Sequence, residues 1–113
     1  MFTYKEYINS GKEFDDWFIE SYDSNPKALF EDAIIEFIVD SFSPIATVME
    51  EEYRWTKAIG QVFEIKDNRF FIVNWEKGLT EYQPDEFFDD TISEVKPVEK
   101  QNTVTVWEDV NNI

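Results

Sequence analysis

Large apolar residues in the first half of the chain recur at intervals of three and four, which is the period of an amphipathic helix. After Ser10, the residues Phe14, Trp17 and Phe18 fall on one side of such a helix. A second set follows at a regular spacing of four residues, at Phe30, Ile34, Ile38 and Phe42. We therefore predict helices that bury these two sets.

Polar residues mark where these helices should begin. Two pairs fit the capping box, in which a hydroxyl and a carboxylate three residues later satisfy free backbone amides. Asn25 followed by Pro26 predicts another helix start, because Asn caps helices and Pro suits the first helical position. That helix should run to about Phe42, before Pro44. The capping-box pairs are Thr3 with Glu6 and Ser10 with Glu13.

The second half of the chain changes to the pattern of β-strands, with aromatic and β-branched residues in short runs. Residues 66–69 suit a hairpin turn. Residues 69–75 carry large apolar side chains on both sides, which predicts a central strand covered on each face. Pro97 marks a sheet edge or strand end, because it has no amide hydrogen to donate. The predicted strands span residues 53–65, 69–75, 91–98 and 102–110.

These patterns predict an α+β fold, with two or three N-terminal helices packed on a four-stranded antiparallel β-sheet. The 113 residues contain no Gly/Ser-rich linker, so we expect one domain, with a helical part at 1–44 and a sheet part at 53–110. The apolar share of 42% and the 11 Phe, 5 Tyr and 4 Trp exclude a disordered acidic tail.

The residue types that the chain lacks remove most catalytic chemistry. There is no Cys and no His, which excludes thiolate chemistry and imidazole bases or ligands. The three glycines are isolated, so no phosphate-binding loop is present. Residues 85–90 lack the spacing and the glycine of a calcium-binding loop. We expect no catalytic residues, no metal and no cofactor.

The apolar runs are too short for a membrane span, and the polar segment after Met1 does not resemble a signal peptide. These features predict a cytoplasmic protein without a membrane partner.

The charge is the most informative feature of the composition. The chain has 25 acidic and 10 basic residues, a formal net charge of −15, and residues 28–53 contain no Lys or Arg. A solvated surface usually mixes both signs, and uncompensated like charges destabilise the folded state. The excess therefore suggests a binding function. We expect the partner-binding residues to be Glu13, Asp16, Glu20, Asp32, Glu36, Asp40, Glu50, Glu51, Glu52, Asp85, Glu86, Asp89 and Asp90.

Such a surface can imitate a nucleic-acid backbone. DNA carries one charge per ~1.7 Å of axis, whereas acids every four residues on a helix give one per roughly 6 Å. One helical row is too sparse, so several acidic segments would have to lie on one side of the molecule. The expected partner is then a basic protein that handles nucleic acid.

Residues 53–77 mix five Lys and Arg residues with aromatic ones, a combination that also occurs in platforms for single-stranded nucleic acid. The net charge of the molecule argues against that function, because nucleic acid would be repelled. We expect these cations to pair with the acidic helices or to flank the core, with no direct nucleic-acid binding.

Seven segments of the second half stand out: RW at 54–55, QVFEI at 61–65, NRFF at 68–71, WEKGLTE at 75–81, QP at 83–84, EVKP at 94–97 and TVTVW at 103–107. Through them, about half of the chain resembles small uncharacterised proteins encoded by phages of Gram-positive bacteria. The size, the acidity and the absence of His and Cys are similar to phage inhibitors of host defence, including anti-CRISPR and anti-restriction proteins. That group shares no motif, so the resemblance assigns no functional residue.

The resemblance implies an inhibitor that acts in the host bacterial cytoplasm and occupies the nucleic-acid site of a defence nuclease. We expect a CRISPR nuclease as the target, with a restriction enzyme as the next choice. Two alternatives remain open, namely a non-enzymatic acidic adaptor or structural phage protein and a small enzyme that uses only carboxylates. One continuous acidic face would favour the inhibitor over the adaptor.

Overall fold

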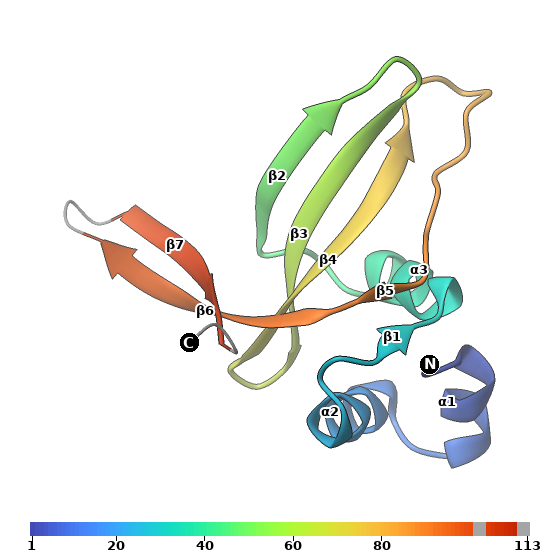
Figure 1. Ribbon diagram of the computed structural model, residues 1–113, viewed down its shortest axis with the longest axis vertical. Helices are drawn as coiled ribbons and strands as arrows, with labels where there is room; N and C mark the ends of the chain where they lie inside the picture. The colour runs from blue at the N-terminus through green and yellow to red at the C-terminus, as the bar shows by residue number, and fades with distance from the viewer. Residues whose placement is uncertain (101–103, 111–113) are drawn as a thin grey trace.

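The computed structural model describes the backbone of residues 1–100 and 104–110 and the side chains of residues 1–98 and 105–110. Its elements confirm the α+β class (Figure 1). They are α1 (Tyr4–Ser10), α2 (Phe14–Ser24), β1 (Leu29–Phe30), α3 (Asp32–Ser41), β2 (Ala46–Glu52), β3 (Thr56–Lys66), β4 (Arg69–Gly78), β5 (Asp90–Thr91), β6 (Ser93–Lys100) and β7 (Val104–Asp109).

The main sheet has five strands in the order β2-β3-β4-β6-β7, so the prediction of four strands was wrong. The missed strand is β2, which lies at an edge and pairs antiparallel with β3. Most of its side chains are exposed, and it ends in three glutamates. An edge strand that buries so little surface has no apolar alternation for a sequence pattern to reveal.

The strand β4 is central, as predicted, and pairs with β3 and β6. The expected cover on each face was wrong, because Phe71 and Val73 are buried whereas Phe70 and Ile72, on the other face, are only half-buried. Its pairing with β6 covers only residues 70–72, and the rest of β6 continues with β7 as a hairpin that projects from the body (Figure 1). Pro97 lies in this projecting part, where β6 has only one neighbouring strand, β7, among the described residues. The predicted start of the last strand, at residue 102, lies outside the described residues.

Two of the predicted helix starts were wrong. Thr3 does cap α1, where its hydroxyl oxygen accepts a hydrogen bond from the Glu6 amide at 3.2 Å. Ser10 is instead the last residue of α1, and its hydroxyl donates to the Tyr7 carbonyl. Asn25 follows the C-terminal end of α2. The third helix begins only at Asp32, because Leu29 and Phe30 first pair with β5.

The core lies between the helices and one face of the main sheet. Phe18 and Phe30 stack at 4.9 Å, and the Phe71 ring of β4 meets Phe18 edge-on at the same distance. Ile34 and Ile38 of α3 are fully buried in the same cluster. The predicted burial of Phe14, Trp17, Phe18, Phe30, Ile34 and Ile38 against the sheet is therefore confirmed. Phe30 is buried from β1 rather than from a helix, and Phe42 and Trp75 are only partly buried.

Candidate acidic binding surface

A chain of surface hollows follows α3 and is lined by acidic side chains. The first hollow, of about 560 Å³, lies between Asp32 and Glu36 of α3 and the loop that carries Asp85 and Glu86. The second, of about 410 Å³, shares Glu36 and continues to Asp40. The third, of about 340 Å³, adjoins the second at Phe37 and Ser41 and is lined by Glu13 and Asp15.

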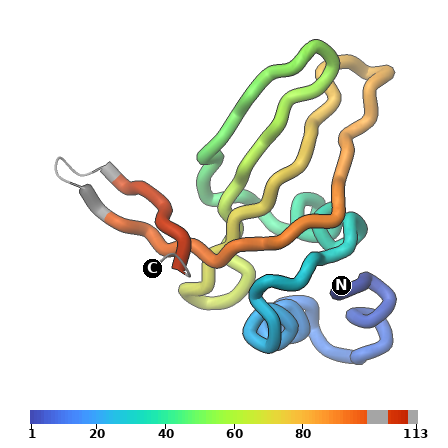
Figure 2. The backbone as a smooth tube through the Cα atoms, in the orientation of Figure 1, coloured from blue at the N-terminus to red at the C-terminus, as the bar shows by residue number. Residues whose placement is uncertain are grey.

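Hydrogen bonds tie the loop 79–89 to both α3 and β4. The Asp32 amide, at the start of α3, donates to a carboxylate oxygen of Asp89 at 2.8 Å. Further up the loop, Glu86 exchanges two backbone hydrogen bonds of 2.8 and 3.0 Å with Glu76 of β4. Figure 2 shows the loop running from the far end of β4 down to β5, next to α3. We call the acids that it brings together with the helices the α3 acidic surface: Glu13, Asp15, Asp32, Glu36, Asp40, Asp85, Glu86 and Asp89.

Among the described residues, the protein's own cations compensate few of these carboxylates; the charge of Asp15 contributes to the raised pKa of Lys66. Within the part of the chain whose side chains are described, none of the ion pairs includes a residue of the α3 acidic surface. Glu36, Asp40 and Asp85 are also exposed. Their charges therefore repel one another and project a negative potential into the solvent.

The other predicted binding residues lie elsewhere. Asp16 and Glu20, on α2, form ion pairs with Lys66 and Lys12, which neutralise most of the predicted α2 row. The hydrogen bond from Lys66 to Asp16 raises the pKa of the lysine. Asp90 lies in β5, where its backbone pairs with Phe30.

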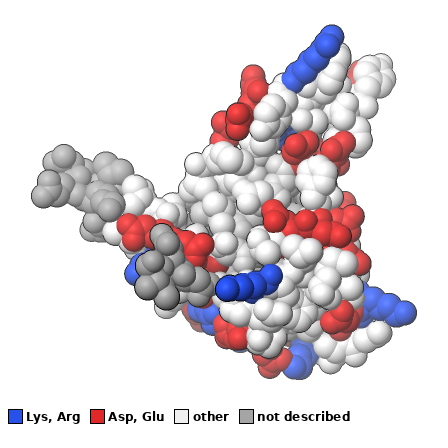
Figure 3. All heavy atoms as spheres, viewed as in Figure 1, with Lys and Arg blue, Asp and Glu red and all other residues white. Residues whose placement is uncertain are grey.

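Three further predicted residues, Glu50, Glu51 and Glu52, lie on the edge strand β2, and Glu50 pairs with Lys57 at 3.2 Å. Figure 3 shows the acidic side chains of the viewed face in several separate groups, the widest of them at the level of α3 and β5. The thirteen predicted residues therefore do not form one surface.

Asp15 was missed by the sequence analysis. It lies one position before Asp16, about 100° around the helix, and lines the third hollow, while its charge also contributes to the raised pKa of Lys66. The apolar residues of α2 alone do not distinguish the directions of Asp15 and Asp16, because both positions border the buried stripe. Only the packing of α2 against α3 separates them.

Two of the five basic residues of the 53–77 region, Lys66 and Arg69, pair with acids of α2, as expected. The Arg69 guanidinium donates two hydrogen bonds to the Glu94 carboxylate, at 2.6 and 3.1 Å, and two more to Asp23 on α2, at 2.8 and 3.4 Å. These carboxylates raise the pKa of Arg69 still further, so it is charged at every accessible pH. Arg54 has a different position, with its guanidinium 4.9 Å from the centre of the Trp55 ring.

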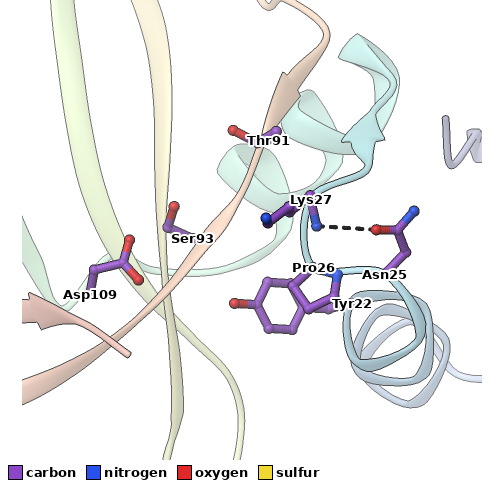
Figure 4. Close-up of a pocket in the computed structure, with 7 residues that line it drawn as sticks. All are labelled: Tyr22, Asn25, Pro26, Lys27, Thr91, Ser93 and Asp109. Atoms are coloured by element: carbon purple, nitrogen blue, oxygen red, sulfur yellow. Dashed lines mark hydrogen bonds between the residues drawn. The ribbon is translucent and has the colours of Figure 1, made fainter. Parts of the chain in front are cut away.

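Another hollow of about 560 Å³ lies between the end of α2 and the strands β5 and β6 (Figure 4). Among the described residues that line it, Asp109 is the one carboxylate and Lys27 the one amine, beside the hydroxyls of Tyr22, Thr91 and Ser93. This lining offers no pair of carboxylates for acid–base work. Across residues 1–98 and 105–110, no group of three or more acidic side chains is placed to hold a metal ion.

No family model, curated protein or solved structure matches this chain. None of the described helices combines the length and the apolar character that crossing a membrane requires.

Proposed function

We propose that this protein is a non-enzymatic inhibitor that binds a basic, nucleic-acid-handling bacterial protein through the α3 acidic surface and blocks access of nucleic acid. The observation that carries the proposal is the meeting of three acidic segments, from α2, α3 and the loop 79–89, without an ion pair among the described residues. A surface that keeps so many carboxylates unpaired binds a complementary Lys/Arg-lined cleft without first breaking internal ion pairs.

One helical row of acids carries too few charges per unit length to imitate DNA, but further acids lie beside the row on α3. Asp32, Glu36 and Asp40 alone give a charge about every 6 Å along α3. The loop adds Asp85, Glu86 and Asp89 beside the first half of that row, and α2 adds two acids beyond its end. The combined charge density is closer to that of a nucleic-acid backbone, with one charge per ~1.7 Å of duplex.

The resemblance to phage proteins supplies the first target to test, a CRISPR nuclease. Purified RNA-guided nucleases and restriction enzymes would be assayed for DNA cleavage with the protein added before or after the DNA. We expect inhibition of at least one nuclease when the protein is added first. A bound DNA should protect the nuclease, and inhibition should weaken as salt is raised.

Two results would contradict the proposal. One is that no nuclease of either class is inhibited, as expected for an adaptor or structural protein. The other is inhibition that is equally effective after DNA has bound and at high salt, which would indicate a mode of binding other than competition through charge.

A further inference from the structure

Four large side chains are exposed together at the end of the main sheet. Tyr53 and Trp55 lie in the turn between β2 and β3, and Leu79 and Tyr82 lie in the loop after β4. The Leu79 amide donates to the Trp55 carbonyl at 3.1 Å, which places the turn and the loop side by side (Figure 1). The exposed fraction is 49% for Tyr53, 55% for Trp55, 41% for Leu79 and 89% for Tyr82. We call these four residues the aromatic tip.

Two hydrogen bonds between residues close in sequence fix the backbone of the loop after β4. The Gln83 amide donates to the Thr80 carbonyl at 3.1 Å, and the Gly78 amide donates to the Asp85 carboxylate at 3.0 Å. A Cβ atom on Gly78 would lie only 1.7 Å from the Gln83 carbonyl oxygen, so this position requires glycine. The loop therefore presents its side chains from a fixed backbone, which lowers the entropy lost when they bind.

The same loop connects the tip to the α3 acidic surface. Leu79 and Tyr82 are followed within a few residues by Asp85 and Glu86, which line the first hollow. The tip carries charges of both signs, because the charge of Glu51 raises the pKa of Tyr53 and the Arg54 guanidinium lies 4.9 Å from the centre of the Trp55 ring. The net charge of −15 argues against stacking of nucleic-acid bases on the aromatic rings and against docking of a second, equally acidic copy.

We propose that the aromatic tip is the specificity-determining anchor for the same basic protein that the α3 acidic surface attracts, with Trp55 and Tyr82 entering an apolar pocket beside the partner's basic cleft. This inference depends on the proposed function. Trp, Tyr and Arg dominate the binding energy of protein interfaces, whereas exposed charge pairs contribute little individually. The acids should then govern how fast the complex forms, and the tip how long it lasts.

The test is to measure association and dissociation rates on a purified RNA-guided nuclease that the wild-type protein inhibits. Trp55→Ser and Tyr82→Ser should each raise the dissociation rate at least about tenfold, with the association rate and its salt dependence unchanged. The matched control is Ile8→Ser, which removes an apolar side chain that is 56% exposed on α1. It should leave both rates unchanged. Tyr82 is so exposed that its substitution should also leave the melting temperature unchanged.

The outcomes separate the two proposals. If the wild-type protein inhibits no nuclease, the proposed function fails and the anchor fails with it. If it inhibits, but both tip variants dissociate like the wild type, only the anchor is refuted. Binding of a twenty-nucleotide oligo-dT that is lost in Trp55→Ser would also overturn the anchor, in favour of a single-strand platform. A wild-type dimer in solution that Tyr82→Ser dissolves would overturn it in favour of self-association.

Discussion

Phe71 and Phe70 are adjacent phenylalanines whose side chains point to opposite faces of the central strand, and we predict very different costs for truncating them. Phe71 is fully buried beneath the helices. Its ring meets those of Phe18 and Tyr22 edge-on, at 4.9 and 5.0 Å. Phe70 lies on the face without helices, where it is half-buried and contacts Trp107 at 5.3 Å.

The magnitude for Phe71→Ala follows from these contacts. Loss of a fully buried aromatic side chain costs about 2–3 kcal/mol in transfer free energy, and each edge-on ring pair adds about 0.5–1.5 kcal/mol. The total of about 3–6 kcal/mol spans the measured range of Phe→Ala costs, about 3–5 kcal/mol. Phe70→Ala, with one ring contact and partial exposure, should cost about 1–2 kcal/mol. Because domains have only about 5–15 kcal/mol of stability, Phe71→Ala should remove a large share of the free energy of unfolding.

Urea denaturation followed by circular dichroism would measure both variants, with the free energy of unfolding taken from the midpoint and slope. The helix-on-sheet core requires that Phe71→Ala lose at least twice as much stability as Phe70→Ala. Equal losses would refute it, since the two faces of β4 would then be covered alike.

Three other predictions concern the cap, the ion-pair cluster and the tip. Thr3→Ala should lower the free energy of unfolding by about 1 kcal/mol, because Thr3 caps α1, and Ser10→Ala should cost clearly less; equal costs in chemical denaturation would contradict the observed helix start. Arg69→Lys should cost about 1–2 kcal/mol, because lysine keeps the charge but loses the paired hydrogen bonds to Glu94; a variant as stable as the wild type would show that the pair contributes nothing. The pKa of Tyr53 should lie above the usual value of about 10, because the charge of Glu51 disfavours the tyrosinate. Its contribution to the free energy of unfolding is therefore present below pH 10 and is lost as pH rises through the pKa of the folded state. In a tyrosinate absorbance titration, with Tyr53→Phe to identify the signal, Glu51→Gln should lower this pKa; no change would place Glu51 away from the tip.

The sequence was sufficient to predict the buried residues, because large apolar side chains at helical or strand spacing have few alternative environments. Phe18, Ile34 and Phe71 are all fully buried as expected. The prediction of helix starts failed where local capping residues competed with strand pairing between distant parts of the chain. Asn25 and Pro26 fit a helix start, yet the chain first forms the short β1–β5 pairing and starts α3 at Asp32.

The acidic residues were correctly identified as a feature, but their grouping was not predictable. Glu20 and Glu36 occupy similar positions on their helices in the sequence pattern. In the fold, Glu20 pairs with Lys12, whereas Glu36 lines two hollows beside α3. Spacing along a helix gives the exposed side of that helix, and only the packing of α2, α3 and the loop 79–89 decides which exposed sides meet.

The most direct test of the α3 acidic surface compares two double variants with the same change in net charge. Glu36→Lys with Asp40→Lys alters the proposed surface, whereas Glu20→Lys with Asp67→Lys alters exposed acids outside it. Association with an inhibited nuclease would be measured at low salt, with melting temperatures as the control for folding. We predict that the first pair slows association at least about tenfold and that the second changes it less than about twofold, with both proteins folded. Equal slowing by the two pairs would contradict the account, because net charge rather than the α3 acidic surface would then govern binding.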